Sequence, residues 1–137
     1  MDQVQHKFVD VGGLKLHVAE IGTGQKETKN LIHLKNQTHM RLPFDHSFVT
    51  FTGPNVVLFL HGFPEIWYSW RHQMIALAKA GFRAIAPDHR GYGLSDPPPQ
   101  PDKASFADIL SDLLNLLDAL QIAKVLKAIN YIWYYLR

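Results

Sequence analysis

The sequence contains no cysteine, which excludes a disulfide framework, a thiolate metal site and a cysteine nucleophile. The first ten residues have no apolar core that could serve as a secretory signal peptide, and no stretch approaches the roughly 20 apolar residues of a membrane span. The last three residues, Tyr-Leu-Arg, are not a peroxisomal or retention signal. We therefore expect a cytoplasmic protein in a reducing compartment, without a membrane partner.

Residues that could bind nucleic acid or metal are few and scattered. The 14 basic and 12 acidic residues give a formal charge of +2, and the basic ones form no patch, so we expect no nucleic-acid partner. His33, His39 and His46 match neither the i, i+4 pair of a helical metal site nor the short spacing of a zinc motif. We expect neither a metal nor a cofactor.

The 137 residues are enough for one domain and too few for two. The first element that they predict is a β-hairpin within residues 1–24, in which two short strands flank Gly12-Gly13. Two glycines supply the positive φ angles that tight hairpin turns favour. After the turn, leucine and valine alternate with Lys15 and His17, so the pattern places His17 on the surface.

A strand, a helix and a second strand follow between residues 56 and 86. The run Val56–Leu60 is short, apolar and rich in β-branched and aromatic residues, which is typical of a strand buried on both faces. Apolar residues then recur at three- and four-residue steps from Trp67 to Ala78, and Gly81 is the expected C-cap of that helix. With a second strand at Phe82–Ala86, this is a βαβ unit whose strands should lie parallel.

Three motifs in this order resemble the α/β-hydrolase superfamily, and within it the soluble plant epoxide hydrolases. They are HGFPEIWYSWRHQM from His61, AGFRAIAPDHRGYGLSDPP from Ala80, and the leucine-rich helix after them, together covering residues 58–125. The resemblance implies an α/β fold. The chain would correspond to the N-terminal portion of that fold: the opening hairpin, the βαβ unit, one further helix and an incomplete sheet.

The resemblance also assigns roles to two loops. It implies that one wall of the pocket, on its oxyanion side, is formed by His61, Gly62, Phe63 and Pro64, with a cis bond between Phe63 and Pro64. The loop after the second strand is expected to be structural, with an Asp88–Arg90 ion pair that shapes it, and its residues are Asp88, Arg90 and Gly91. Ligand sites of open α/β sheets gather at this end of the strands.

The leucine-rich helix runs from about Phe106 to Leu120, with Ser105 as its expected N-cap and Asp108 at N3. The resemblance stops at Val125, where the family continues with the strand that leads to its nucleophile. Residues 126–137 form a divergent tail that periodicity assigns either to a helix through Trp133 or to a strand at residues 130–135. Without the family's strand, one edge of the central strand would be open and could promote self-association.

Residues 25–53 do not fit the resemblance. In the family the second strand passes directly into the His-Gly strand, whereas here about thirty mixed residues intervene, far more than an ordinary loop contains. We interpret this segment as a poorly ordered insertion, with the hypothesis that it is retained intron sequence translated in frame. The domain plan is therefore a hairpin over 1–24, an insertion over 25–53, a hydrolase core over 54–125 and the tail.

The chemistry of the family requires a nucleophile on a sharp strand-to-helix turn, a histidine and an acid. None of the five serines lies in a Gly-x-Ser-x-Gly frame, and Ser95 is the nearest, in a loop. No catalytic residue is identifiable, and His61 belongs to the pocket wall. The resemblance therefore implies an inactive fragment of an enzyme whose family hydrolyses epoxides to diols through an aspartyl ester, with a small apolar epoxide or ester as its partner. The alternatives are a hydrolase completed by a second chain and a non-catalytic interaction module.

Overall fold

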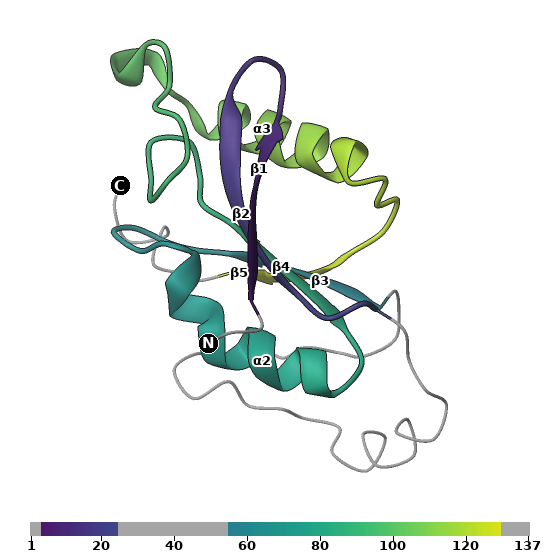
Figure 1. The fold of residues 1–137 in the computed structure, drawn as a ribbon. Coiled ribbons are helices and arrows are strands. Elements are labelled where there is room, and N and C mark those ends of the chain that lie inside the picture. Colours follow the sequence, from purple (N-terminus) through teal and green to yellow (C-terminus); the bar gives the residue numbers. More distant parts are fainter. Residues whose placement is uncertain (1–3, 25–54, 130–137) are drawn as a thin grey trace.

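The structure, a computed structural model, describes residues 4–24 and 55–129. Their strands form one five-stranded sheet in the order β1-β2-β4-β3-β5 (Figure 1). The β1–β2 and β2–β4 pairs are antiparallel, and the β4–β3 and β3–β5 pairs are parallel. The elements are β1 (Gln5–Asp10), β2 (Lys15–Ile21), β3 (Val56–Leu60), the 3₁₀ turn η1 (Trp67–Trp70), α2 (Arg71–Lys79), β4 (Arg83–Pro87), the 3₁₀ turn η2 (Pro101–Lys103), α3 (Phe106–Ala119) and β5 (Leu126–Ile129).

The N-terminal hairpin is confirmed. Gly12 and Gly13 both have positive φ angles, 99° and 92°, and the Val11 N–H donates to the Leu14 carbonyl at 2.8 Å across the turn. One carboxylate oxygen of Asp10 accepts hydrogen bonds from both glycine N–H groups, at 2.9 and 2.8 Å. These bonds satisfy backbone donors that the tight turn leaves without a partner in the strand ladder.

The βαβ unit is also confirmed. Strands β3 and β4 are adjacent and parallel, and α2 connects them after the single turn η1. The helix ends at Ala80 as its C-cap, and Gly81 follows with a φ of 85°, a conformation that costs glycine little. The second strand begins one residue later than expected, at Arg83.

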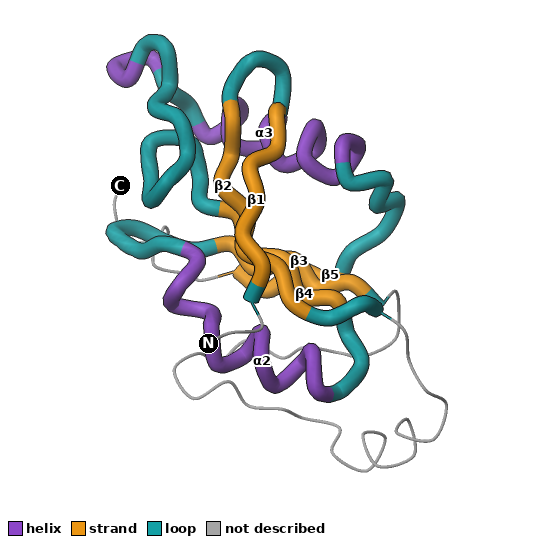
Figure 2. The backbone as a smooth tube through the Cα atoms, viewed as in Figure 1, coloured by secondary structure: helices purple, strands orange, loops and turns teal. Residues whose placement is uncertain are grey.

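Two apolar cores cover the two faces of the sheet, and α2 and α3 lie on opposite sides of it (Figure 2). The core on the α2 side is built around Phe59, Trp70, Met74, Leu77 and Phe82. The core on the α3 side is built around Leu16, Val18, Leu58, Ile85 and Leu116. Because both faces of β3 and β4 are covered, their sequences read as apolar runs rather than as alternating patterns.

The C-terminal part of the described chain differs from the expectation. Residues Leu126–Ile129 form β5, which pairs in parallel with β3 over its whole length. The helical extension is therefore wrong for these residues, and the predicted open edge on β3 is wrong as well. In the described sheet the outer strands are β1 and β5. The proposed insertion at residues 25–53 and the tail beyond Ile129 lie outside the described residues.

Helix α3 begins as its sequence predicts. The Ser105 side chain accepts from the Asp108 N–H, and the Asp108 carboxylate accepts from the Ser105 N–H at 2.8 Å, which together form a capping box. These hydrogen bonds lower the pKa of Asp108. Within residues 4–24 and 55–129, no helix combines the length and apolar character needed to cross a bilayer.

Candidate functional site

Two loops leave the carboxyl ends of β3 and β4 and lie against each other. Two histidines join the loops. Both are buried, since His61 is 1% exposed and His89 is 5% exposed. The His61 Nε2 accepts a hydrogen bond from the His89 N–H at 3.0 Å, while its Nδ1 lies 2.9 Å from the Gly62 carbonyl oxygen. This network assigns the proton of His61 to Nδ1. The ring therefore holds the two loops together, and its Nε2 lone pair is already used.

Burial keeps both histidines neutral at physiological pH. It lowers the pKa of His61, and burial together with the neighbouring His61 lowers the pKa of His89 to about 4. The His89 Nε2 lies 3.2 Å from the His61 carbonyl oxygen, which adds a second contact between the loops. A neutral ring whose acceptor nitrogen is occupied is poorly suited to act as a general base.

The depressed pKa values predict acid sensitivity. Lowering the pH from 7 to 5 is expected to reduce the free energy of unfolding by about 2 kcal/mol, because His89 gains a proton near pH 6.5 when unfolded and near pH 4 when folded. In that window the unfolded state binds more protons, so stability falls as the pH falls. Urea unfolding followed by circular dichroism at both pH values measures the change. His89→Asn should flatten the slope, and His72→Asn, at an exposed position of α2, is the control.

Residues His61 to Pro64, to which the resemblance assigns a pocket wall, lie in the first loop, directly after β3. The Phe63–Pro64 peptide bond is cis, and the Phe63 ring is 43% exposed. Its neighbour is the ring of Tyr92 from the second loop, with 6.4 Å between centroids and an edge-to-face arrangement. Tyr92 also contacts the His61 ring at 5.3 Å. The two loops therefore present a partly exposed aromatic surface of the kind that lines apolar ligand sites.

Asp88 joins three segments that are distant in sequence. Its side chain is 0% exposed and its carboxylate contacts His17 Nδ1 at 2.8 Å, the Trp67 N–H at 2.8 Å and the Leu94 N–H at 3.3 Å. The His17 Nε2 in turn lies 2.9 Å from His6 Nδ1. The carboxylate thus fixes the positions of the hairpin and of both loops relative to one another.

The expectation that His17 is a surface residue is wrong. The ring is 0% exposed, because β2 lies inside the sheet between β1 and β4 and is covered on both faces. The alternation of Lys15 and His17 with apolar residues suggested a strand with one wet face. The burial of His17 could have been inferred from the run Leu16–Ile21. This run contains a single charged residue, as is typical of a strand that is buried on both faces.

The predicted Asp88–Arg90 ion pair is also wrong. The Arg90 guanidinium makes two hydrogen bonds of 2.7 Å to the carboxylate of Asp112 on α3, and a third contact of 3.8 Å to Asp108. The bond to Asp112 raises the pKa of Arg90. The structural role predicted for Arg90 is thus exercised between the loop and α3. Gly91, with a φ of 78°, allows the loop to turn there.

Ser95 is a loop serine whose hydroxyl is occupied by structural hydrogen bonds. Its Oγ donates to the Asp88 carbonyl at 2.7 Å and accepts from the His17 N–H at 2.9 Å. Next to it, the Asp96 carboxylate accepts from the Lys15 N–H at 2.9 Å. These bonds attach the second loop to β2 and leave the Ser95 hydroxyl poorly placed to attack a substrate.

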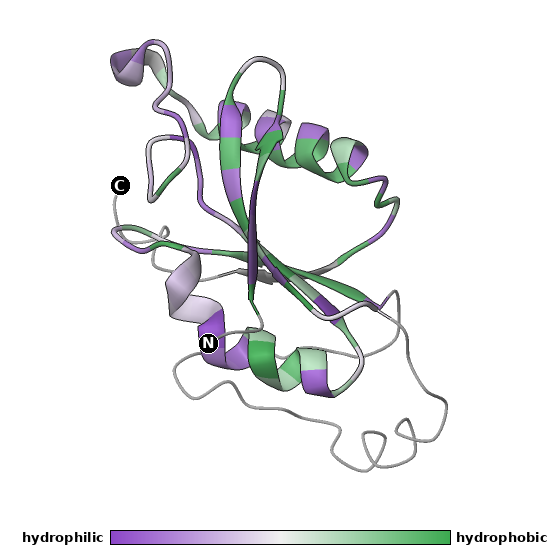
Figure 3. Ribbon diagram, viewed as in Figure 1, coloured by the Kyte–Doolittle hydropathy of each residue, from purple (hydrophilic) through white to green (hydrophobic). Residues whose placement is uncertain are grey.

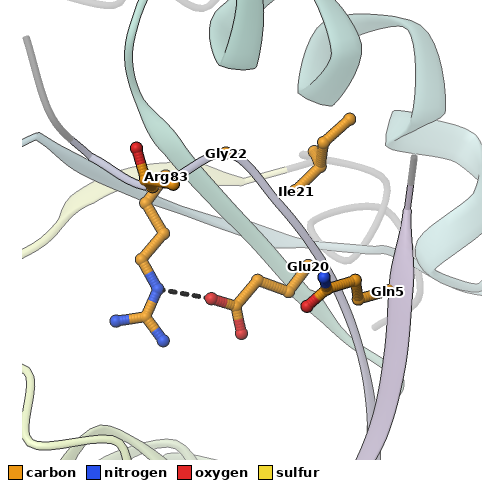
Figure 4. Close-up of a pocket in the computed structure, with 6 residues that line it drawn as sticks. Gln5, Glu20, Ile21, Gly22 and Arg83 are labelled. Carbon is orange, nitrogen blue, oxygen red and sulfur yellow. Dashed lines mark hydrogen bonds and ion pairs between the residues drawn. The ribbon is translucent and has the colours of Figure 1, made fainter.

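A separate hollow of about 410 Å³ lies where β2 ends and β4 begins, away from the two loops. Figure 4 shows that Arg83 and Glu20 form an ion pair in it, and Lys7 also pairs with Glu20. Burial opposes ionisation of Glu20, but hydrogen bonds from Arg83 and Lys7 outweigh it and lower the pKa of the carboxyl. Among the described residues, no group of three or more His, Cys, Asp or Glu side chains could hold a metal ion.

The sheet order, the two parallel strands with loops at their carboxyl ends, and the His-Gly-Phe-Pro turn define an α/β-hydrolase. Residues 55–129 match the family described as alpha/beta hydrolase fold, and the chain belongs to that family. The match extends past Val125 to include β5.

The curated relatives include plant epoxide hydrolases, as the sequence motifs predict. The chain is 41% identical over 125 residues to epoxide hydrolase 3 of Siraitia grosvenorii, covering 91% of this chain and 30% of that protein. Among solved structures, the epoxide hydrolase of Vigna radiata has a TM-score of 0.69 at 36% identity, covering 94% of this chain and 32% of its own. A laboratory-evolved variant of the potato epoxide hydrolase has a TM-score of 0.67 at 36% identity, with 93% and 32% covered. The chain thus spans about a third of the length of these relatives.

Proposed function

We propose that this chain supplies the pocket wall of an epoxide hydrolase-like enzyme and does not hydrolyse epoxides by itself. Two observations together carry the proposal. The His61–Pro64 loop is held by hydrogen bonds to the second loop, and the sequence lacks the glycine-flanked motif that presents the family's nucleophile. No two of the nine glycines are four residues apart, so neither Gly-x-Asp-x-Gly nor Gly-x-Ser-x-Gly occurs.

The residues that are present can bind and polarise a substrate more readily than they can attack it. The exposed Phe63 ring and its neighbour Tyr92 offer an apolar surface to an aryl epoxide or ester. His61 and His89 are neutral and hydrogen-bonded to each other's loops, and the Ser95 hydroxyl is occupied. On comparable hydrolases, removal of the whole catalytic triad lowers the rate about 10⁶-fold. The absence of cysteine fits a cytosolic setting for this role.

The experiment is an assay of the purified chain with styrene oxide and with a p-nitrophenyl ester. We expect diol and phenol formation at the rate of buffer alone. Turnover clearly above buffer, together with a covalent adduct that mass spectrometry maps to one residue of the chain, would contradict the proposal. Phe63→Ala is the matched variant, because genuine turnover in this pocket should depend on that ring whereas a contaminating esterase should not.

A second candidate function is a non-catalytic interaction module. The observation that favours it is the position of β5 as an outer strand of the described sheet, where backbone groups can pair with another chain. Self-association through this edge would make the apparent mass depend on protein concentration in size-exclusion chromatography. A monomer at every concentration would exclude it.

A further inference from the structure

A hydrogen-bonded series of three side chains leads from a buried carboxylate to the surface of the protein. Asp88 and His17 are both 0% exposed, whereas His6 is exposed on β1. The Asp88 carboxylate lies 2.8 Å from His17 Nδ1, and His17 Nε2 lies 2.9 Å from His6 Nδ1. The two imidazole rings are nearly parallel, at 8°, and their centroids are 5.1 Å apart. The exposed ring is therefore connected to the buried carboxylate through one intervening imidazole.

The position of each proton follows from the carboxylate at the buried end. An ionised carboxylate only accepts hydrogen bonds, so His17 Nδ1 carries a proton and donates it to Asp88. In the neutral pair of histidines, His17 Nε2 is then the acceptor and His6 Nδ1 is the donor. The remaining nitrogen of the exposed ring, His6 Nε2, keeps its lone pair. This lone pair is the nucleophilic end of the series.

The order of the three groups is that of acid, base and nucleophile in hydrolytic triads, where an adjacent base takes the proton that the nucleophile loses. When His6 Nε2 attacks a carbonyl carbon, positive charge develops on the His6 ring. The proton on His6 Nδ1 can then pass to His17 Nε2, which lies within hydrogen-bond distance. The resulting His17 imidazolium is paired with the Asp88 carboxylate, so the buried charge is compensated.

The surroundings of His6 suit a small apolar reagent. The His6 ring meets the Trp67 ring edge to face, with 4.9 Å between centroids. Phe8, which is 58% exposed, lies two residues along β1 on the same face of the strand. Figure 3 shows polar residues along the first half of β1, which is an outer strand of the described sheet. A reagent can therefore reach His6 from solvent and rest against aromatic rings.

We propose that His6 is an acylation site, at which Nε2 reacts with activated carbonyl compounds of the anhydride class and His17 accepts the displaced proton. A bond forms between His6 Nε2 and the carbonyl carbon, and the bond from that carbon to the leaving oxygen breaks. The leaving group departs as a carboxylate or carbonate anion, and the His6 Nδ1 proton moves to His17 Nε2. The acyl group stays on His6, so one donor is consumed per chain. The site is therefore independent of the proposed function and predicts no turnover.

The test is the reaction of the full chain with diethyl pyrocarbonate at pH 7, followed by trypsin digestion and mass spectrometry. His6 and His72 fall in the tryptic peptides 1–7 and 72–79, each of which contains a single histidine. We expect His6 to be carbethoxylated at least roughly tenfold faster than the exposed His72, because a positioned base accelerates such a step. The reaction of His6 should also slow more in heavy water than that of His72, since only at His6 does a proton move as the new bond forms.

His17→Gln tests the role of the intervening base. Its amide oxygen can still accept a hydrogen bond from His6 but cannot take up the proton, so the rate at His6 should fall to that of His72. Far-ultraviolet circular dichroism checks that this variant is folded. His6→Gln is the matched control and should remove the fast phase without altering the reaction of His72.

Two results would overturn the proposal. One is an equal rate at His6 and His72 in the parent chain, a comparison that does not depend on whether His17→Gln folds. The other is a folded His17→Gln variant in which His6 still reacts at the parent rate, because the series would then only hold β1 to β2.

Discussion

Replacing Asp88 with alanine is expected to lower the free energy of unfolding by about 3–5 kcal/mol. The carboxylate is 0% exposed and contacts three groups: the buried His17 ring and the part-buried N–H groups of Trp67 and Leu94. Its removal leaves all three without that partner, and the His17 ring, which is 0% exposed, cannot turn to water instead. Because a domain of this size is stabilised by roughly 5–15 kcal/mol in total, much of the variant should be unfolded in mild urea.

Urea unfolding followed by far-ultraviolet circular dichroism measures this loss. Asp88→Asn keeps the size of the side chain and one acceptor oxygen, and should therefore lose less than Asp88→Ala. Asp118→Ala removes an exposed carboxylate from α3 and should stay within about 0.5 kcal/mol of the parent. If Asp88→Ala and Asp118→Ala unfolded at the same urea concentration, Asp88 would not be a central contact of the domain.

Gly93→Ala is expected to cost about 3 kcal/mol for a related reason. A Cβ at this position would lie 2.0 Å from Asp88 Oδ2, and the residue has a φ of 54°. The carboxylate cannot move away without leaving its donors. The loop must therefore shift, and the contacts between the second loop and the rest of the domain weaken with it.

The control for Gly93→Ala is Gly13→Ala in the hairpin turn. Gly13 also has a positive φ, 92°, but an added Cβ there would meet nothing within 4 Å. It should cost only the roughly 1–2 kcal/mol of a left-handed conformation. Thermal or urea unfolding of the two variants separates the steric part of the loss from the conformational part. Equal losses would show that the contact with Asp88 adds nothing.

Local signals in the sequence predicted most of the fold. The hairpin depends on the two adjacent glycines, the helix start on the reciprocal bonds of Ser105 and Asp108, and β3 on one short apolar run. Each of these features is decided by residues within a few positions of one another. The motif resemblance supplied the cis bond between Phe63 and Pro64, which the spacing of residues alone does not indicate.

The features that sequence reasoning missed depend on non-local packing. His17 is buried because β4, about seventy residues later, pairs with β2 and places it inside the sheet. Arg90 pairs with Asp112 rather than Asp88 because α3 passes beside the loop, and its orientation is set by the α3-side core. Strand β5 forms from four residues whose periodicity is ambiguous, and its pairing with β3 decides their conformation.

Within the candidate site, the sequence predicted the His61–Pro64 loop but not the hydrogen bonds that hold it to the second loop. The hydrogen bond from the His89 N–H to His61 requires two strands to end side by side at the same edge of the sheet. That geometry follows from the βαβ topology, whereas the choice of partner atoms does not. The three-segment contact of Asp88 was missed for the same reason.

The bonds from residues 88–96 back to β2 also bear on how the chain is made at the ribosome. His17 and Lys15 meet their partners only after Asp88, Ser95 and Asp96 have been synthesised, across separations of 71, 78 and 81 residues. At a translation rate of roughly 5–20 residues per second, the nascent hairpin waits on the order of several seconds for them. Such high contact order predicts that the native state forms slowly. Until these partners have been synthesised, the hairpin remains accessible to chaperones.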